Sequence, residues 1–137
     1  MEPMSGSEGT LIEHALDLET IDTNLYRSKE LWTPVGSRGV FGGQVVGLAL
    51  SAAAKTIDAK FHVHSLHSYF LFAGDHTVPI IYRVHIVRDG KSYATRSVTA
   101  HQHGIVIFTL MCSFHVTEES SLIHQASERM LYPEKMI

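Results

Sequence analysis

The spacing of apolar residues changes along the chain and predicts one helix followed by several strands. Between Gln44 and Ile57, apolar residues fall on nearly every side of a helical projection, which predicts a buried helix. Its alanines and glycine are small enough to permit close approach to a sheet. Before it, Leu11 to Leu18 carries a short helical stripe, and Thr20 to Arg27 alternates loosely as a first strand.

Four strand-like segments follow this helix. They cover His62 to Phe72, Val78 to Val87, Ser92 to His101 and Ile105 to Val116. Asp89-Gly90 predicts a type I′ hairpin turn, because this pair adopts positive φ angles readily, and Gln102-His103-Gly104 marks the next turn. The order predicts an α+β fold in which an antiparallel meander wraps around one apolar helix.

Polar and glycine-rich stretches set the expected boundaries. Residues 1–10 are predicted to form a disordered leader, 11–116 the folded domain, and 117–137 a linker or docking segment. Within the domain, Leu31 to Gly43 is expected to be a loop, because glycine and proline interrupt it repeatedly.

Composition narrows the class of protein. The chain has 137 residues, 45% of them hydrophobic, and a formal net charge of −3, which fits one ordered domain. Eleven basic residues against fourteen acidic ones argue against a nucleic-acid partner. Neither a secretory signal nor an apolar run long enough to span a bilayer is present in these residues, so no membrane span is expected. A single cysteine, Cys112, excludes an internal disulfide framework and is expected in the core.

Gly42-Gly43-Gln44 opens the predicted helix and is the first candidate site. Free N–H groups at a helix start polarise a carbonyl or hold an anion, and two glycines permit close approach of a substrate. The Gln44 side chain is a candidate to hold a water molecule or a carbonyl. The alternative is that the glycines only form a tight turn.

The ten histidines invite a metal interpretation, which strand geometry disfavours. Strict alternation places His62 and His64 on one face and His67 on the other, so three ligands do not converge. We therefore predict neither a metal nor a cofactor. His67 remains a candidate general base, because imidazole titrates near neutral pH, and the alternative is a histidine satisfied by hydrogen bonds.

Two basic residues flank the predicted hairpin turn. Gly90-Lys91-Ser92 mimics the end of a phosphate-binding loop, but the first glycine of that motif is replaced by His85 and a strand follows instead of a helix. Arg88 and Lys91 are therefore candidates to meet a phosphate at the rim of a loop, and the alternative is a solvated turn.

Several motifs together resemble the acyl-CoA thioesterase II family, which includes peroxisomal long-chain acyl-CoA thioesterases. The matching segments are Phe41 to Gly47, His64 to Leu71 with Ala73-Gly74-Asp75, Arg88 to Tyr93 with Arg96-Ser97-Val98, and Gln102-His103-Gly104 with Ile107-Phe108. The resemblance covers roughly residues 15–116. It implies a hot-dog fold and hydrolysis of fatty acyl-CoA to free fatty acid and CoA.

Members of that family carry two hot-dog halves, and their water-activating Asp, Ser or Thr, and Gln belong to the second half. No position in this sequence matches those three residues, so none is assigned, although Gln44 occupies the helix-start position where the other half places its Asp. The resemblance implies acyl-CoA as substrate, a second half or a homo-oligomer as partner, and a peroxisomal location, with the cytoplasm as the alternative.

Two other functions are weighed against the thioesterase. The chain is either an active half or a non-catalytic module that binds acyl-CoA or assembles with a partner. An acyl-CoA dehydratase of the same fold is disfavoured, because that chemistry needs an acid at the helix and Gln44 supplies none.

Overall fold

The computed structural model of the protein describes residues 15–37 and 39–116, which form an antiparallel sheet and one long helix. The elements are β1 (Leu18–Asp22), β2 (Leu25–Ser28), α2 (Gly42–Ala54), β3 (Phe61–Phe70), β4 (Ile81–Asp89), β5 (Tyr93–Gln102) and β6 (Ile105–Val116). The predicted leader (1–10) and the linker or docking segment (117–137) lie outside the described residues, so both stay predictions.

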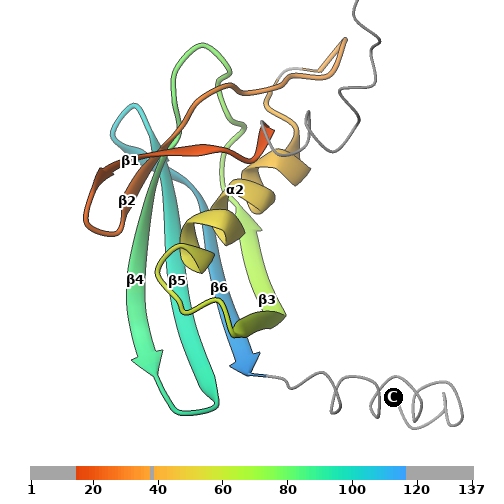
Figure 1. Ribbon diagram of the computed structural model, residues 1–137. Helices are drawn as coiled ribbons and strands as arrows, with labels where there is room; N and C mark the ends of the chain where they lie inside the picture. Colours follow the sequence, from red (N-terminus) through yellow and green to blue (C-terminus); the bar gives the residue numbers. More distant parts are fainter. Residues whose placement is uncertain (1–14, 38, 117–137) are drawn as a thin grey trace, which may run out of the picture.

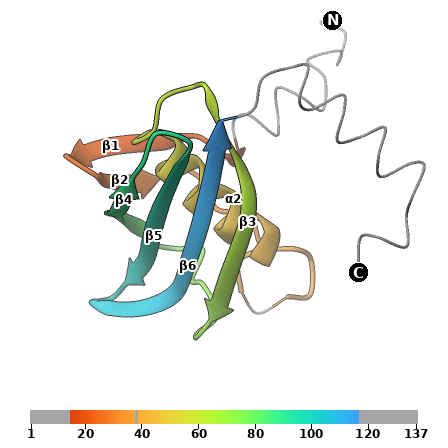
Figure 2. The ribbon, with the colours of Figure 1, turned by 90° about the horizontal axis from the view of Figure 1, so that it is seen from below.

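The strands follow the order β1-β2-β4-β5-β6-β3 in one six-stranded sheet (Figure 1). Figure 2 shows α2 lying inside the curve of this sheet, which bends around it. The helix packs mainly against β5, β4 and β6 and hardly contacts β3. The predicted α+β architecture, an antiparallel sheet around one helix, is therefore confirmed.

The predicted four-stranded meander is wrong in one respect. β4, β5 and β6 do form a meander, but β3 pairs with β6 at the far edge instead of with β4. Residues 71–80 carry the chain across the end of the sheet, and the N–H groups of Leu71 and Phe72 donate to the Ile107 carbonyl on the way. Ten residues span about 33 Å when extended, which exceeds the roughly 14 Å across three strand spacings.

One strand prediction and one turn prediction also fail. Thr20 to Arg27 is not one strand, because the chain reverses at Thr23-Asn24, where Asn24 adopts a φ of 56° and the Asp22 carboxylate accepts the Thr23 N–H. The type I′ geometry expected at Asp89-Gly90 occurs instead at His103-Gly104, with φ angles of 52° and 77°. Asp89 stays within β4, and three residues connect it to β5.

The helix buries one face instead of its whole circumference. Val45, Leu48, Ala49, Ala52 and Ala53 are buried against the sheet, whereas its opposite side, including Val46 and Leu50, is only half-buried. The alanines let the sheet approach, and Leu48, which is fully buried, contributes about 1.5–3 kcal/mol. Where the sheet is closest, the Tyr82 hydroxyl donates to the Val45 carbonyl at 3.1 Å.

A buried arginine closes the C-terminal end of the helix. Arg96 on β5 is 1% exposed, and its guanidinium donates to the Thr56 hydroxyl at 2.8 Å and the Thr56 carbonyl at 3.2 Å. It also donates to the carbonyls of Arg88 and Thr95 and forms an ion pair of 2.8 Å with Asp89. A guanidinium presents five N–H donors in a fixed fork, which fits this set of acceptors better than an ammonium does.

We predict that Arg96→Ala lowers the free energy of unfolding by about 3 kcal/mol, because it leaves buried carbonyls unsatisfied and opens a cavity. Urea unfolding measures this loss. Arg88→Ala, on the exposed side of the neighbouring strand, is the matched control and should change stability by less than about 0.5 kcal/mol. Equal effects of the two substitutions would contradict the role given to Arg96.

Candidate functional site at the start of the helix

The first turn of α2 leaves backbone donors available. Phe41 is the N-cap residue, and its carbonyl accepts the N–H groups of Gln44 at 3.1 Å and Val45 at 3.3 Å. Its side chain makes no capping bond, and the first turn holds no acidic residue. By helix geometry the N–H groups of Gly42 and Gly43 have no carbonyl within the helix to bind. They form the positive end of the helix dipole.

Of the two glycines at this turn, Gly43 is required by the packing and Gly42 is not. A Cβ atom at Gly43 would lie 2.6 Å from the Phe41 ring, so a side chain there requires Phe41 to move. A Cβ atom at Gly42 would touch the Phe70 ring at 3.4 Å, which is an ordinary contact distance. Gly43 therefore allows the Phe41 ring to pack closely against the helix start, while Gly42 leaves room beside the Phe70 ring for a side chain as small as alanine.

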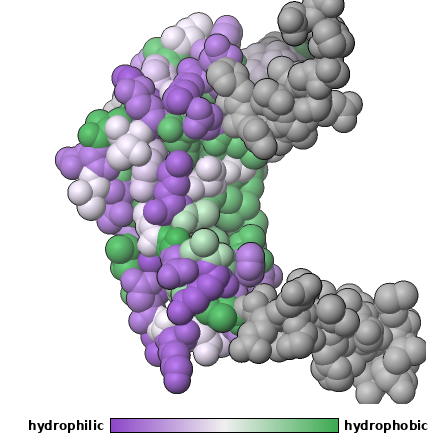
Figure 3. Space-filling model, in the orientation of Figure 1, coloured by the Kyte–Doolittle hydropathy of each residue, from purple (hydrophilic) through white to green (hydrophobic). Residues whose placement is uncertain are grey.

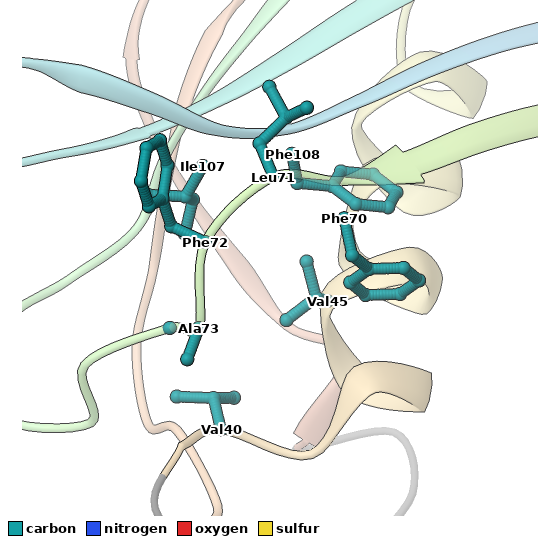
Figure 4. A pocket seen from close by; sticks show the side chains of 9 residues that line it. Val40, Val45, Phe70, Leu71, Phe72, Ala73, Ile107 and Phe108 are labelled. Atoms are coloured by element: carbon teal, nitrogen blue, oxygen red, sulfur yellow. The ribbon is translucent and has the colours of Figure 1, made fainter.

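Two apolar pockets lie on either side of the helix start. The first, of about 210 Å³, lies between α2, the end of β3 and β6 (Figure 4). It is lined by Val40, Val45, Phe70, Leu71, Phe72, Ala73, Gly74, Ile107 and Phe108. The second, of about 350 Å³, is lined by Ala15, Leu16, Trp32, Phe41, Gly43 and Gln44. None of these lining residues titrates, so the walls of the two pockets provide apolar space and backbone donors but no acid or base.

Gln44 is fully engaged with the backbone. Its side chain is buried, and Oε1 accepts the Trp32 N–H at 2.7 Å. Both hydrogens of Nε2 are used, because this atom donates to the carbonyls of Ala15 at 2.9 Å and Glu30 at 2.7 Å. The geometry therefore makes Gln44 a clamp that holds the preceding loop against the first turn of α2, and it leaves the amide no hydrogen for a substrate carbonyl.

A second buried glutamine, which the sequence pattern did not single out, holds the loop beside the first pocket. Gln102 accepts the Asp75 N–H at 2.8 Å and donates to the carbonyls of Asp75 at 2.7 Å and Val78 at 2.9 Å. Hydrogen bonds from the Thr77 hydroxyl and N–H, and then from His103, lower the pKa of Asp75 to about 2. Extending the buried–exposed alternation of β5 by one residue would have placed Gln102 inside.

The prediction that His67 faces away from His62 and His64 is wrong. A β-bulge between Val63 and Ser65 shifts the alternation of β3. His62 pairs with His115, His67 pairs with Met111, and His64 contacts Ser113, so all three lie on the outer face, which points away from α2. Even so, the described residues contain no group of three His, Cys, Asp or Glu side chains placed to hold a metal ion.

Arg88 and Lys91 lie far from the helix start. Arg88 lies on the outer face of β4, opposite Thr95. Lys91 lines a pocket of about 360 Å³ at the C-terminal end of α2, together with Lys60, Asp89 and Arg96. Because 13 helical residues rise about 20 Å, these two cations do not share a site with Gly42 and Gly43.

Comparison with known proteins identifies the family. A family model described as "Acyl-CoA thioesterase N-terminal domain" matches residues 29–115, which cover most of the described elements. The chain belongs to this acyl-CoA thioesterase family. The resemblance read from the motifs is therefore confirmed.

Curated relatives agree with this assignment. Acyl-coenzyme A thioesterase 8 of Mus musculus is 47% identical over 117 residues, which are 85% of this chain and 36% of that protein. Acyl-CoA thioesterase 2 of Haemophilus influenzae is 42% identical over 106 residues, covering 77% and 36% of the two chains. The chain thus spans about a third of the length of these thioesterases.

A solved structure confirms the fold of this thioesterase domain. Acyl-CoA thioesterase II TesB2 from Mycobacterium marinum superimposes with a TM-score of 0.69 and 42% sequence identity, covering 80% of this chain and 39% of that one. A hot-dog protein from Alicyclobacillus acidocaldarius, 22% identical, superimposes with a TM-score of 0.67. The expected hot-dog fold is confirmed.

We predict that Gln44→Ala makes the Trp32 backbone amide exchange with solvent about tenfold faster, because that N–H loses its acceptor. Amide hydrogen exchange followed by NMR measures the change. Gln102→Ala is the matched control, since it removes a similar set of bonds and should expose the Asp75 amide instead. Equal acceleration at Trp32 in both variants would show only general loss of stability and contradict a local clamp.

Proposed function

We propose that this thioesterase domain forms one half of an active site that hydrolyses fatty acyl-CoA to free fatty acid and CoA. The observation that carries the proposal is the uncapped first turn of α2 between two apolar pockets. Related proteins named as acyl-CoA thioesterases support it. The N–H groups of Gly42 and Gly43 are proposed to bind the thioester carbonyl oxygen, and an apolar pocket to hold the acyl chain.

In this mechanism water attacks the carbonyl carbon, and negative charge develops on the carbonyl oxygen. Donors fixed in advance at that oxygen stabilise the charge, because they need no reorganisation as it forms. The tetrahedral intermediate then collapses, the C–S bond breaks, and CoA leaves as a thiolate that takes up the proton released from water. Gln44 acts as a positioning residue here, since it holds the loop that precedes the donors.

The attacking water needs a base, which the two apolar pockets at the helix start do not provide. Their lining residues are aliphatic, aromatic, glycine or amide. We therefore propose that a second hot-dog unit supplies the water-activating groups. His67 lies on the outer face of β3, and Arg88 and Lys91 lie away from the helix start, so none of them is part of the proposed half-site. Their roles as a base and at a phosphate stay predictions.

The edge strand β3 is the proposed contact with that second unit. β3 is paired on one side only, at the end of the sheet order. Its helix-facing side carries exposed Val63, Leu66 and Phe70, which α2 does not cover. Figure 3 shows hydrophobic surface gathered on the side of the molecule where β3 and α2 lie. An unpaired, apolar strand edge favours association with another strand.

A peroxisomal location is proposed on the resemblance to relatives. The Saccharomyces cerevisiae relative, named a peroxisomal acyl-coenzyme A thioester hydrolase, is 38% identical over 117 residues and is covered over 34% of its length. Among the described residues, no helix is long and apolar enough to cross a membrane.

We predict that the 137-residue chain alone releases CoA from long-chain acyl-CoA about 100-fold more slowly than the same chain mixed with a second hot-dog unit from the mouse relative. General acid–base groups contribute at least this factor. Thiol release measures the rate. Cys112 does not interfere, because burial raises the pKa of its thiol to about 11 and keeps it unreactive.

Two substitutions test where the second unit binds. Leu66→Asp on β3 should abolish the gain in rate, whereas Ile21→Asp, an equally exposed position on the opposite edge strand β1, should leave it intact. Fast turnover by the pure chain as a monomer would overturn the half-site proposal. Binding of acyl-CoA without turnover, even with the second unit present, would favour the non-catalytic module.

A further inference from the structure

A cationic groove lies on the outer face of the sheet, on the opposite side from the helix. It has a volume of about 340 Å³. It is lined by Val78, Pro79, Ile81, Arg83, His101, Gln102, His103 and Gly104. The groove is separate from the pockets at the helix start, which lie on the α2 side. It combines an apolar floor with three basic side chains.

The register brings these basic groups together. Ile81 lies directly opposite His101, and Arg83, two residues further along β4 on the same face, lies opposite Thr99. Arg83 is therefore a diagonal neighbour of His101, within reach of a long side chain. His85 continues the same row, opposite Ser97. The ring of His101 is held in place by the Thr99 hydroxyl at 2.9 Å.

Arg83 and His101 form no ion pair with a carboxylate among the described residues, whereas His103 pairs with Asp75 at 3.2 Å. Strands β3, β4, β5 and β6 contain one carboxylate, Asp89, which lies on the helix side and binds Arg96. Asp75 is bound to Thr77 and His103 at the groove edge. On the neighbouring β2 and β1, Arg27 is already paired with Glu19.

Arg83 has no ion pair with any carboxylate in residues 15–37 and 39–116, unlike Arg27, Lys29 and Arg96. Burial, followed by repulsion from Arg83 and His85, lowers the pKa of His101. The folded groove therefore disfavours the protonated form of His101, first through burial and then through repulsion, and a bound anion would reduce the repulsive part. This arrangement favours binding of a negative ligand, because the anion relieves the repulsion between the basic side chains.

We propose that the groove lined by Arg83, His101 and His103 binds a phosphoryl group. A guanidinium fork matches two phosphate oxygens, and the imidazole of His101 supplies a further donor, whereas His103 at the groove edge is held by Asp75. The ligand is either free phosphate or the phosphomonoester end of a larger molecule, whose uncharged part would contact Val78, Pro79 and Ile81. The inference goes beyond the proposed thioester hydrolysis and does not depend on it.

The test follows the ring signals of His101 by NMR in the full 137-residue chain. Inorganic phosphate is added at constant ionic strength, with chloride as the comparison. Saturating phosphate should shift the His101 signals and raise the pH at which the ring titrates. Binding should weaken as pH rises, because His101 loses its proton. A shift produced equally by chloride, or no shift at high millimolar phosphate, would overturn the proposal.

Two variants that each remove one positive charge make the test specific to the groove. Arg83→Gln should weaken phosphate binding about tenfold, because it removes a charge-assisted pair of hydrogen bonds. Lys55→Gln is the control: it also removes one positive charge, but Lys55 is exposed at the C-terminal end of α2 and does not line the groove. Equal weakening in both variants would show general attraction to a basic surface and overturn the site.

The same titration distinguishes the two sources of the phosphoryl group. Adenosine 3′,5′-bisphosphate, CoA and inorganic phosphate are compared as ligands of the wild-type chain. Tighter binding of a phosphomonoester than of inorganic phosphate assigns the groove to a larger phosphorylated molecule, and equal binding assigns it to free phosphate. Because no thioester is cleaved in this experiment, its outcome is independent of the hydrolysis assay.

Discussion

The packing of one apolar helix face against a curved sheet is the constraint on which the rest of the structure depends. Ala49, Ala52 and Ala53 bring the sheet close to α2, and the Tyr82 hydroxyl fixes the approach by its bond to the Val45 carbonyl. The sheet bends to cover this face, but the helix makes few contacts with β3. The apolar side of β3 therefore stays exposed next to the helix start.

The two ends of the helix differ in how their backbone groups are hydrogen-bonded. At the C-terminal end, the Arg96 guanidinium satisfies the carbonyl of Thr56 and binds its hydroxyl, so that end is closed. At the N-terminal end, Gln44 secures the preceding loop, while no side chain caps the first N–H groups. The first N–H groups of the helix, which have no carbonyl within the helix to bind, therefore lie beside apolar pockets and near the edge strand β3, as the proposed half-site requires.

The local sequence pattern predicted most of the helices and strands, but it did not predict which strands pair. The apolar run after Gly43 and the alternation of Ile105 to Val116 specify a helix and a strand by themselves. The position of β3 beside β6 does not follow from local pattern, because the crossing by residues 71–80 depends on contacts between distant residues. The bulge at His64 moved His67 to the outer face, since one extra residue reverses every later side chain on a strand.

The sequence predicted where the candidate residues lie along the fold, but it did not predict the hydrogen bonds that they form. Gly42 and Gly43 lie where the motif indicated, at the start of the helix. The clamp formed by Gln44 was not predictable, because its partners Ala15, Glu30 and Trp32 offer backbone atoms, and the sequence does not show that these three meet at one side chain. Arg96 was missed as a buried charge for the same reason: only the folded chain shows that carbonyls surround it.

Hydrogen exchange on the assembled site tests the central claim most directly. The 137-residue chain is mixed with a second hot-dog unit and a non-hydrolysable acyl-CoA analogue, and backbone protection is mapped by residue. The account predicts that the unpaired edge of β3 becomes protected on mixing, and that the Gly42 and Gly43 amides gain protection when the analogue is added. Protection confined to β1, or analogue binding that leaves Gly42 and Gly43 unchanged, would contradict it.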